Sequence, residues 1–319
     1  MNAVTLRQRT LRLGSRRSPM AIAQSRQVAS LITERTGRPV EIVGVTTLGD
    51  VSRAQLTQIG GTGVFVSALR ETLLGGEVDL AVHSLKDLPT VPAASIVLAA
   101  VPTRDDPRDA LVARDGAKLA DLPPGARIGT GSPRRAAQLL ALRGDLRCVP
   151  IRGNAGTRLG KVSEGELDGV VLGYAGLARI GYVSAVTQVF EPDEMLPAPG
   201  QGALAVECRD GEPELAALLG AVTDQASLAA VTGERSLLEA LEAGCSAPIG
   251  AYAAGTEQLR MQAAVIGTDG RRVLRAHGAA PAADARRLGR DLAAELLRSG
   301  ASDLISVPEA STNSRNDVQ

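Results

Sequence analysis

Apolar and polar positions divide most of the chain into short buried strands and Ala/Leu-rich helices. Short apolar runs next to glycine-containing turns begin near residues 11, 40, 80, 127 and 146. Continuous apolar runs of this length are typical of strands covered on both faces, as in a parallel sheet. Helical patterns follow the first and fourth runs. The pattern predicts an α/β protein built from strand–helix–strand units.

Two stretches of the chain repeat each other. Residues 11–24 resemble residues 127–138, and each stretch passes from an apolar run through a glycine turn into Ser-Pro (Ser18-Pro19 and Ser132-Pro133). Serine before a helix and proline at its first position are the preferred helix start. Gly-Glu-x-Asp recurs at 76–79 and 165–168. We expect two similar doubly wound domains of the periplasmic-binding-protein type around a cleft, with both repeated helix N-termini facing it.

Proline-rich segments predict the domain boundaries. We expect domain 1 at 1–102 and 202–222, because segments 101–107 and 196–202 read as crossings and the run 203–209 would return to the first sheet. Domain 2 would span 103–201. A smaller α+β domain 3 would span 223–308, with a helix to Glu242, strands at 262–266 and 272–276, and a last helix that starts at Asp284 and ends at Leu297. Residues 309–319 read as a disordered tail.

The first copy of the repeat is longer than the second, and the extra residues include 48–63. This stretch ends in Gly60-Gly-Thr-Gly63. Glycines on a long connection predict a mobile lid. A nucleotide-binding P-loop is disfavoured, since no Lys-Ser/Thr pair follows at the required spacing.

Seven arginines lie in or next to glycine- and serine-rich loops: Arg16, Arg17, Arg134, Arg135, Arg152, Arg158 and Arg179. An arginine grips a carboxylate or phosphate through two parallel hydrogen bonds and stays charged. A single loop arginine is often only a solvated surface residue. The repetition favours a site for a small ligand that carries several negative charges.

Composition limits the class of partner. Lys+Arg and Asp+Glu are both 35, aromatic residues make up 2%, and tryptophan is absent. A nucleic-acid binder is therefore disfavoured, because it needs a positive field and stacking side chains. No apolar run approaches the ~20 residues that span a bilayer. Three widely spaced cysteines without a CxxC pair fit neither a disulfide framework nor zinc. We expect a cytoplasmic protein without a membrane or metal partner.

Two segments carry candidate chemistry. His83-Ser84-Leu-Lys86-Asp87 follows a buried strand, where ligands bind in doubly wound folds. It reads either as a surface Lys–Asp pair or as a site in which Asp87 stabilises a developing positive charge. His83 is a weaker candidate, since a histidine at a strand end is often merely hydrogen-bonded. Cys245 lies in a glycine-rich turn that favours exposure. A lone cysteine is more often buried, which is the interpretation for Cys148 and Cys208.

These segments together resemble the porphobilinogen deaminase (hydroxymethylbilane synthase) family. The motifs occur in order from about residue 10 to 305: Arg16 with Ser18-Pro19, His83-Ser84-x-Lys86-Asp87, Asp106-Pro-Arg-Asp109, Arg134-Arg135, Arg152-Gly-Asn-x-Gly-Thr-Arg158, Gly200-Gln-Gly-Ala203 and Glu242-x-Gly-Cys-x-x-Pro-Ile-Gly250.

The resemblance implies a transferase that joins four porphobilinogen units head to tail, with release of ammonia, into hydroxymethylbilane. It also implies a dipyrromethane cofactor bound to Cys245 through a thioether. Asp87, with Lys86, would be catalytic and would stabilise the cationic azafulvene. The cofactor would be held by a set that includes both of them: Ser84, Lys86, Asp87, Thr130, Ser132, Arg134, Arg135 and Gly202. Substrate and the growing polypyrrole would be held by Arg16, Ser18, Arg152, Arg158 and Arg179.

Two positions of the lid depart from the family pattern. Many relatives carry lysines there, whereas Gln58 and Thr62 stand at the matching positions. A cationic role of the lid is therefore in doubt, although Arg53 and Arg70 flank it.

The rival interpretation is a non-catalytic anion-binding protein of the periplasmic-binding type. That class would need neither Cys245, Asp87 nor a third domain, and it should carry an export signal. We expect a monomeric enzyme.

Overall fold

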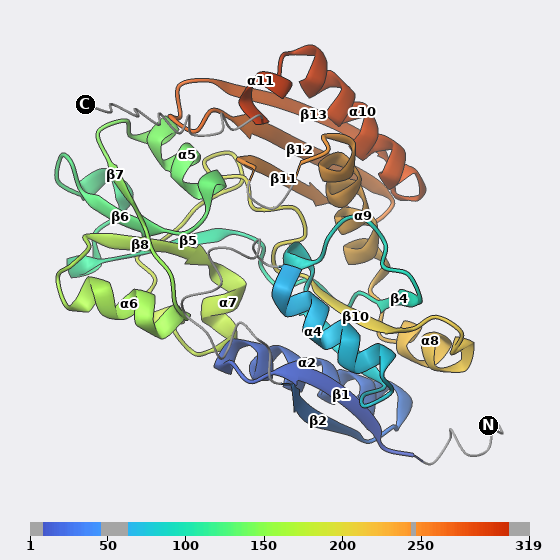
Figure 1. The fold of residues 1–319 in the computed structure, drawn as a ribbon. Coiled ribbons are helices and arrows are strands. Elements are labelled where there is room, and N and C mark those ends of the chain that lie inside the picture. The colour runs from blue at the N-terminus through green and yellow to red at the C-terminus, as the bar shows by residue number, and fades with distance from the viewer. Residues whose placement is uncertain (1–8, 46–62, 244–246, 306–319) are drawn as a thin grey trace, which may run out of the picture.

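The computed structural model describes residues 9–45, 63–243 and 247–305. Within them the chain forms two five-stranded sheets and one three-stranded sheet, each with its own helices (Figure 1). The predictions for Cys245, for Gln58 and Thr62, for the lid up to residue 62 and for the tail at 309–319 lie outside the described residues.

The first sheet combines the N-terminal strands with one strand from much later in the chain. Its order is β2-β1-β3-β10-β4, with β1, β2 and β3 parallel and β10 antiparallel to both neighbours. The predicted return of 203–209 to this sheet is confirmed. The elements are β1 (Leu11–Arg16), α2 (Pro19–Thr36), β2 (Val40–Val45), α4 (Gly63–Leu74), β3 (Leu80–Ser84), β4 (Ile96–Ala100), β10 (Leu204–Arg209) and α8 (Pro213–Gly220).

Both faces of the first sheet are covered by helices. Leu80 and Val82 of β3 belong to the apolar core formed with α2 and α8, whereas Ala81 between them packs with residues of α4 on the other face. Successive side chains of a strand point to opposite faces, so a run that is apolar throughout must be covered twice. The buried run therefore places the polar group Ser84 to Asp87 at the strand end.

The second sheet repeats this topology. Its order is β7-β6-β8-β5-β9, with β6, β7 and β8 parallel and β5 antiparallel to β8. The predicted fold class of two similar α/β units is confirmed by this repetition. The elements are β5 (Asp109–Ala113), β6 (Arg127–Thr130), α5 (Pro133–Leu142), β7 (Arg147–Pro150), α6 (Ala155–Ser163), β8 (Gly169–Gly173), α7 (Tyr174–Arg179) and β9 (Gln188–Val189).

The two repeated helices begin as predicted. The Ser18 hydroxyl accepts a hydrogen bond from the Ala21 amide at 3.2 Å, and the Ser132 hydroxyl accepts one from the Arg135 amide at 3.4 Å. Proline follows each serine at the helix start. These caps fix where α2 and α5 leave their sheets, at the ends of β1 and β6.

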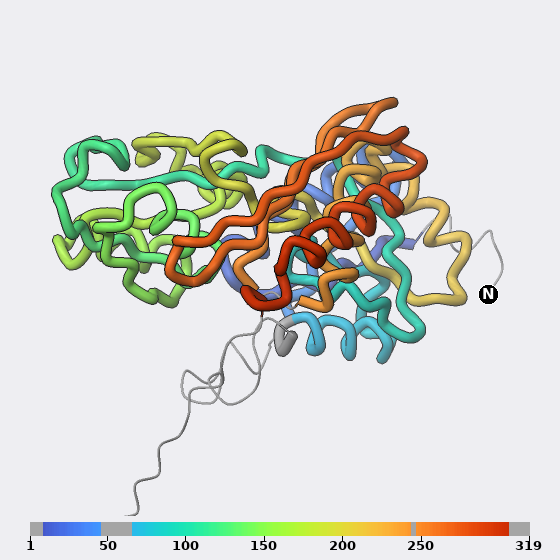
Figure 2. Tube along the Cα trace, turned by 90° about the horizontal axis from the view of Figure 1, so that it is seen from above, coloured from blue at the N-terminus to red at the C-terminus, as the bar shows by residue number. Residues whose placement is uncertain are grey.

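The third sheet is antiparallel and belongs to a unit with three helices. Its strands are β11 (Ile249–Ala254), β12 (Gln258–Ile266) and β13 (Val273–Pro281), and its helices are α9 (Gln225–Ala240), α10 (Ala285–Arg298) and α11 (Ser302–Ile305). Asp284 stands at the N-cap of α10, but its carboxylate accepts from Arg287 rather than from a helix amide. Figure 2 shows these strands, in orange and red, running beside both other units.

Two crossing segments join the first two sheets. The first, 101–108, leads from β4 to β5, and the second, 190–203, leads from β9 to β10. Short 3-10 turns complete the described structure at Leu85–Asp87, Arg114–Gly116, Leu119–Asp121, Val183–Ala185 and Ala282–Asp284. The domain limits at 102, 202 and 222 stay predictions.

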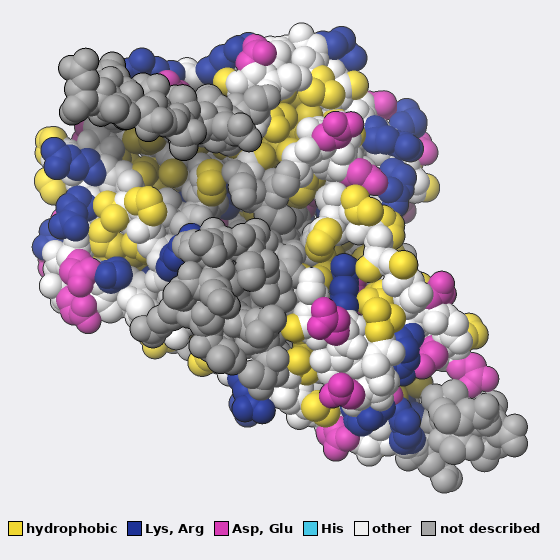
Figure 3. Space-filling view, in the orientation of Figure 1, with side chains coloured by type: hydrophobic (Ala, Val, Ile, Leu, Met, Phe, Trp, Pro, Cys, Tyr) yellow, Lys and Arg dark blue, Asp and Glu magenta, His cyan; other side chains and the backbone are white. Residues whose placement is uncertain are grey.

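No single helix among the described residues has the length and apolarity to cross a bilayer. The pair α8 and α9 meets that test only when joined across a bend of 108°. On the face drawn in Figure 3, basic and acidic side chains are interspersed.

Candidate active site

The segment with the predicted acid lies at the carboxyl end of β3. Ser84 is the last residue of the strand, and Leu85–Asp87 forms one 3-10 turn directly after it. Leu85 is fully buried, and its amide donates to the Ala203 carbonyl at 3.0 Å. This anchor fixes the turn, and Lys86 and Asp87 beside it remain partly exposed.

Lys86 reaches from this turn toward the second sheet. Its Nζ donates to Gln201 Oε1 at 3.2 Å. Burial and the nearby Arg135 guanidinium lower the pKa of Lys86 to about 8, although Asp87 and Asp109 act in the opposite direction. The ammonium is still the main form at neutral pH, and it is held where like charges surround it.

Arg134 and Arg135 share one buried carboxylate. They occupy the first turn of α5, and Arg134 Nη2 lies 2.7 Å from Asp109 Oδ2 while Arg135 Nη2 lies 2.8 Å from Oδ1. Burial would raise the pKa of Asp109, but the two guanidinium charges and a hydrogen bond from Gln201 bring it to about 2. Two cations therefore face one anion, which leaves a local excess of positive charge.

The two arginines differ in their other partners. Arg134 is 3% exposed and also donates to the Leu196 carbonyl, and burial lowers its pKa. Arg135 donates to the Val171 carbonyl at 3.2 Å and to Gln201 Oε1 at 3.3 Å. Both arginines are thus held by Asp109 and a backbone carbonyl, and Arg135 also contacts Gln201, whose amide oxygen accepts from Lys86.

The predicted hydroxyl groups lie beside these arginines. Thr130 ends β6, and its Oγ1 accepts from the Ser132 amide at 3.2 Å. The Ser132 hydroxyl caps α5 and the Ser18 hydroxyl caps α2, so both already serve the helix starts. Their role toward a ligand stays a prediction.

Arg152 and Arg158 lie on the neighbouring loop after β7. Arg152 is exposed, and Arg158 is half-buried with its Nε donating to the Gly153 carbonyl at 2.9 Å. Burial and then the charge of Arg135 lower the pKa of Arg158. The structure therefore places Arg158 in the same positive region as Arg135. Arg16 ends β1 and is partly buried.

Arg179 and Gly202 meet at the crossing segments. Arg179 Nη2 lies 2.7 Å from Asp105 Oδ2 and donates to the Gly202 carbonyl at 2.7 Å. Gly202 has φ 86°, and a Cβ there would lie 2.5 Å from the Asp105 carbonyl oxygen. Both residues thus fix the joint between the sheets, and their predicted roles toward substrate and cofactor stay predictions.

Three buried polar residues of this region were missed by sequence reasoning. Asp109 and Gln201 were noticed only as letters within longer motifs, and Glu207 lies inside an apolar strand pattern. His83 is buried, and its Nε2 lies 3.2 Å from Glu207 Oε2. Arg70 of α4 donates to the same carboxylate at 3.0 and 2.6 Å.

The Glu207 carboxylate ties α4, β3 and β10 together just before the Ser84–Asp87 turn. Burial raises its pKa, but the close contact of His83 and the hydrogen bonds from Arg70 bring the value to about 2. A single glutamate in a strand pattern does not by itself indicate a functional residue. Glu207 could be identified only from the structure, in which Arg70 and His83 lie against its carboxylate.

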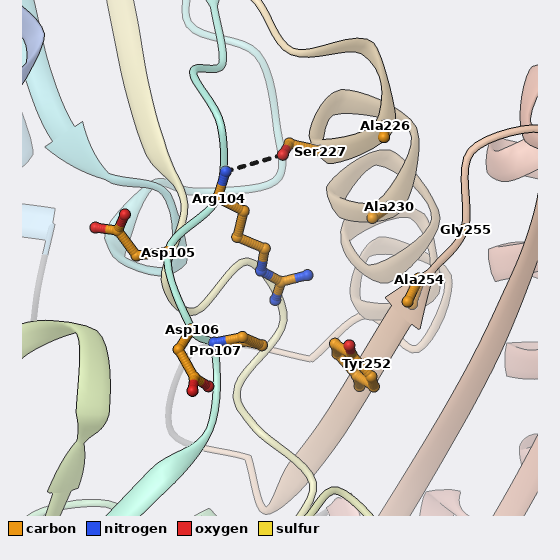
Figure 4. A pocket seen from close by; sticks show the side chains of 11 residues that line it. Arg104, Asp105, Asp106, Pro107, Ala226, Ser227, Ala230, Tyr252, Ala254 and Gly255 are labelled. Atoms are coloured by element: carbon orange, nitrogen blue, oxygen red, sulfur yellow. Dashed lines mark hydrogen bonds between the residues drawn. The ribbon is translucent and has the colours of Figure 1, made fainter.

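A pocket of about 220 Å³ lies elsewhere, between the first crossing segment, α9 and β11. Figure 4 shows Arg104 pointing into it toward Tyr252, with the Arg104 amide bonded to the Ser227 hydroxyl at 2.9 Å. None of the predicted site residues lines it. Among the described residues, no group of His, Cys, Asp and Glu side chains could hold a metal ion.

The fold and site define a class of protein. Two sheets of equivalent topology bring the turn with Lys86 and Asp87 next to the arginines of α5. This is a two-lobed α/β protein whose site has the charges needed to bind a polycarboxylate and to stabilise charge during a reaction.

Comparison with known families assigns the chain more closely. Residues 11–217 match the family model described as "Porphobilinogen deaminase, dipyromethane cofactor binding domain", and residues 228–298 match the C-terminal domain of the same family. The chain belongs to the porphobilinogen deaminase family.

Curated relatives include porphobilinogen deaminase of Thermobifida fusca (strain YX), which is 60% identical over 92% of this chain and 95% of that protein. Porphobilinogen deaminase 1 of Streptomyces coelicolor is 54% identical over 93% of this chain and 98% of that protein. The family, the transferase activity and the dipyrromethane cofactor predicted from the sequence are confirmed by these matches.

Solved structures of similar shape include the methionine-binding protein MetQ, with a TM-score of 0.44, 12% identity, and coverage of 67% of this chain and 88% of that one. The VFT2 domain of Bordetella pertussis BvgS has a TM-score of 0.42, 18% identity, and coverage of 69% and 88%.

Proposed function

We propose that this chain performs its family's reaction with the residues described above. Four porphobilinogen units are joined head to tail into hydroxymethylbilane, each with release of ammonia. The observation that carries the assignment of residues is the contact of Lys86 and Arg135 with one amide, that of Gln201. Through this contact the Leu85–Asp87 turn at the end of β3 lies next to Arg135 at the start of α5.

The charges around Lys86 fit a ligand with several carboxylates. Lys86, Arg134 and Arg135 outnumber Asp87 and Asp109, and Arg158 adds to the positive region. Arginine binds carboxylates through paired, charge-assisted hydrogen bonds. When bound, the dipyrromethane supplies the free pyrrole carbon to which the first substrate unit is joined.

Asp87 supports the step in which ammonia leaves. The C–N bond of the substrate aminomethyl group breaks, the nitrogen keeps the electron pair, and positive charge develops on the remaining methylene and pyrrole. A fixed carboxylate stabilises this charge most when it is already in place. The methylene carbon then forms a C–C bond to a free pyrrole carbon, and the Asp87 carboxylate accepts the proton that this carbon loses and passes it to the released ammonia.

The buried arginines and the more exposed arginines have different proposed roles. Arg134 and Arg135 are buried and ordered by Asp109, which suits a group that stays bound. Arg152 is exposed and Arg158 half-buried, which suits a chain that grows and leaves. Arg16 and Ser18, at the end of β1, would contact the same substrate from the first sheet. The bond between Arg179 and Gly202 would hold the two crossing segments in a fixed position relative to each other.

We also propose that the chain acts as a monomer in the cytoplasm. Cys148 and Cys208 are unpaired thiols in the described structure, as expected in a reducing compartment. Size-exclusion chromatography with light scattering would measure the mass of the particle.

The intact mass of purified protein tests the proposed function. We expect an adduct of two pyrrole units on the wild type, on Cys148→Ala and on Cys208→Ala, and neither adduct nor activity in Cys245→Ala. An active enzyme with an unmodified Cys245 would contradict the assignment. Cys208 is a matched control, because burial raises the pKa of its thiol to about 11.

A further inference from the structure

The side-chain amide of Gln201 lies at the junction of the two sheets, on the second crossing segment. Its Oε1 accepts from Lys86 Nζ at 3.2 Å and from Arg135 Nη2 at 3.3 Å. Its Nε2 donates to Asp109 Oδ1 at 2.8 Å and to the Pro107 carbonyl at 2.7 Å. The residue is 2% exposed. Both donors and both acceptor positions of the amide are therefore used.

The backbone on each side of Gln201 is fixed. The Gly200 amide donates to Glu234 Oε2 at 2.7 Å, and the Gly202 carbonyl accepts from Arg179 at 2.7 Å. The Gln201 carbonyl accepts from Arg104 Nε at 2.7 Å. Because Gly200 and Gly202 have φ of 76° and 86°, the turn is also one that other residues rarely adopt. The amide is thus held in place from both directions.

We infer that Gln201 is a positioning residue that holds Lys86 of the first sheet and Arg135 of the second at a fixed separation. This inference rests on the proposed function only in giving those two cations a role at the site. It adds a residue that acts through Lys86 and Arg135.

The chemistry of the amide explains why glutamine suits this position. A neutral carbonyl oxygen accepts from two cations at once, and the NH₂ group donates to Asp109. Glutamate could accept from both cations, but it would face Asp109 with a second carboxylate. Leucine would fill the space but leave Lys86, Arg135 and Asp109 each short of a buried partner.

The titration of Lys86 offers a direct test, because the chain has three lysines, Lys86, Lys118 and Lys161. Trace acetylation with acetic anhydride across a pH series, followed by peptide mass spectrometry, gives the midpoint for each amine. Lys118 is exposed and serves as the internal reference. The charged protein groups that act on Lys86 include Asp87, Asp109, Arg134 and Arg135, and the variants leave all four unchanged. Because the carboxylates of a bound cofactor would also act on Lys86, midpoints are compared between preparations with the same fraction of adduct.

The two main variants should move the Lys86 midpoint in opposite directions. Gln201→Glu places a carboxylate within hydrogen-bond distance of the ammonium and should raise the midpoint by about one pH unit or more. Gln201→Leu removes an acceptor from the ammonium and should lower it. Gln201→Asn keeps an amide that is one methylene shorter, so it should shift the midpoint in the same direction as leucine.

Gln138→Leu is the matched control. Gln138 is also buried, but its side chain bonds to backbone atoms of Leu196 and Arg134. Its loss should disturb packing and leave the Lys86 midpoint unchanged. A common shift in the same direction for Gln201→Glu, Gln201→Leu and Gln138→Leu would overturn the inference, as would an unchanged midpoint in all Gln201 variants.

The intact mass of each preparation separates this inference from the proposed function. A missing adduct on the wild type would contradict the proposed function, whereas the Lys86 midpoints would still decide the role of Gln201. If the positioning role is correct, folded Gln201 variants should also show a lower fraction of protein with the adduct than Gln138→Leu does.

Discussion

Glu234 of α9 and Arg104 of the first crossing segment form an ion pair in which the Glu234 side chain is 0% and the Arg104 side chain 8% exposed. The Glu234 oxygens lie 2.6 and 3.0 Å from the two terminal nitrogens of Arg104. The same carboxylate accepts from the amides of Gly200 and Ala253 at 2.7 and 2.8 Å. The Arg104 guanidinium also lies 5.8 Å from the Tyr252 ring centre. One carboxylate on α9 thus joins both crossing segments to the third sheet.

Glu234→Gln should strongly destabilise the fold. It leaves the Arg104 charge buried without its counter-ion, and breaking a buried pair in this way costs about 3–5 kcal/mol. Urea unfolding followed by circular dichroism would measure the loss in unfolding free energy. Glu239→Gln is the control, because Glu239 lies on the same helix with a side chain that is 48% exposed. A loss below about 1 kcal/mol for Glu234→Gln, the range of exposed pairs, would contradict the joining role.

Glu207 should make the stability depend on pH below about 5. Its folded pKa of about 2 lies below the ordinary value of 4.5. A depressed folded pKa contributes stability that is complete above the unfolded pKa and is lost as pH falls through the folded one. The contribution is about 3 kcal/mol at neutral pH. Unfolding free energies between pH 5 and 2 should fall less steeply for Glu207→Gln than for the wild type.

The comparison has an internal control in Asp109, whose pKa is also about 2 and which titrates in the same range. Glu207→Gln should keep the part of the slope due to Asp109. A slope for Glu207→Gln equal to that of the wild type would show that the His83–Glu207–Arg70 contacts do not hold the carboxylate in its ionised form.

Asp87→Asn should reduce turnover by roughly 10²–10³-fold, because a fixed charge that stabilises the transition state is removed. Asparagine keeps the shape, so the unfolding free energy should change little. Single-turnover rates and urea unfolding would separate the two effects. Asp193→Asn, an exposed residue on the second crossing segment, is the control. Turnover of Asp87→Asn within threefold of the control would remove Asp87 from the proposed role.

The two groups of arginines should give different intact-mass spectra. Arg134→Leu and Arg135→Leu should leave mostly unmodified protein, because each removes one of the two buried cations that we propose hold the cofactor. Arg152→Leu and Arg158→Leu should carry the adduct but stall during elongation. Each lost charge-assisted contact should cost roughly 1.5–3 kcal/mol. The same loading and the same ladder of bound pyrroles in all four variants would disprove the division.

Local patterns in the sequence predicted the elements that depend on neighbouring residues. The Ser18 and Ser132 caps and the strand Val40–Val45 agree with the structure because capping and alternation act over a few residues. The helix of the third unit was predicted to end at Glu242 and ends at Ala240. Strand β5, from Asp109 to Ala113, was not predicted, because a five-residue apolar run has no distinctive period.

The sequence by itself determined the repeated α/β units, the family resemblance, and the presence of an acid, a lysine and a set of loop arginines. Only the tertiary structure decided which of these groups meet. Lys86 and Gln201 are 115 positions apart, and Arg104 and Glu234 are 130 apart. Such pairs depend on how the crossing segments stack the sheets, and no local pattern records that. The physical reason is that a buried charge is costly without a counter-ion, and the counter-ion is whichever opposite charge lies nearby in the folded protein. Arg179 therefore pairs with Asp105, and Asp109 pairs with two arginines, although these residues are far apart in the sequence.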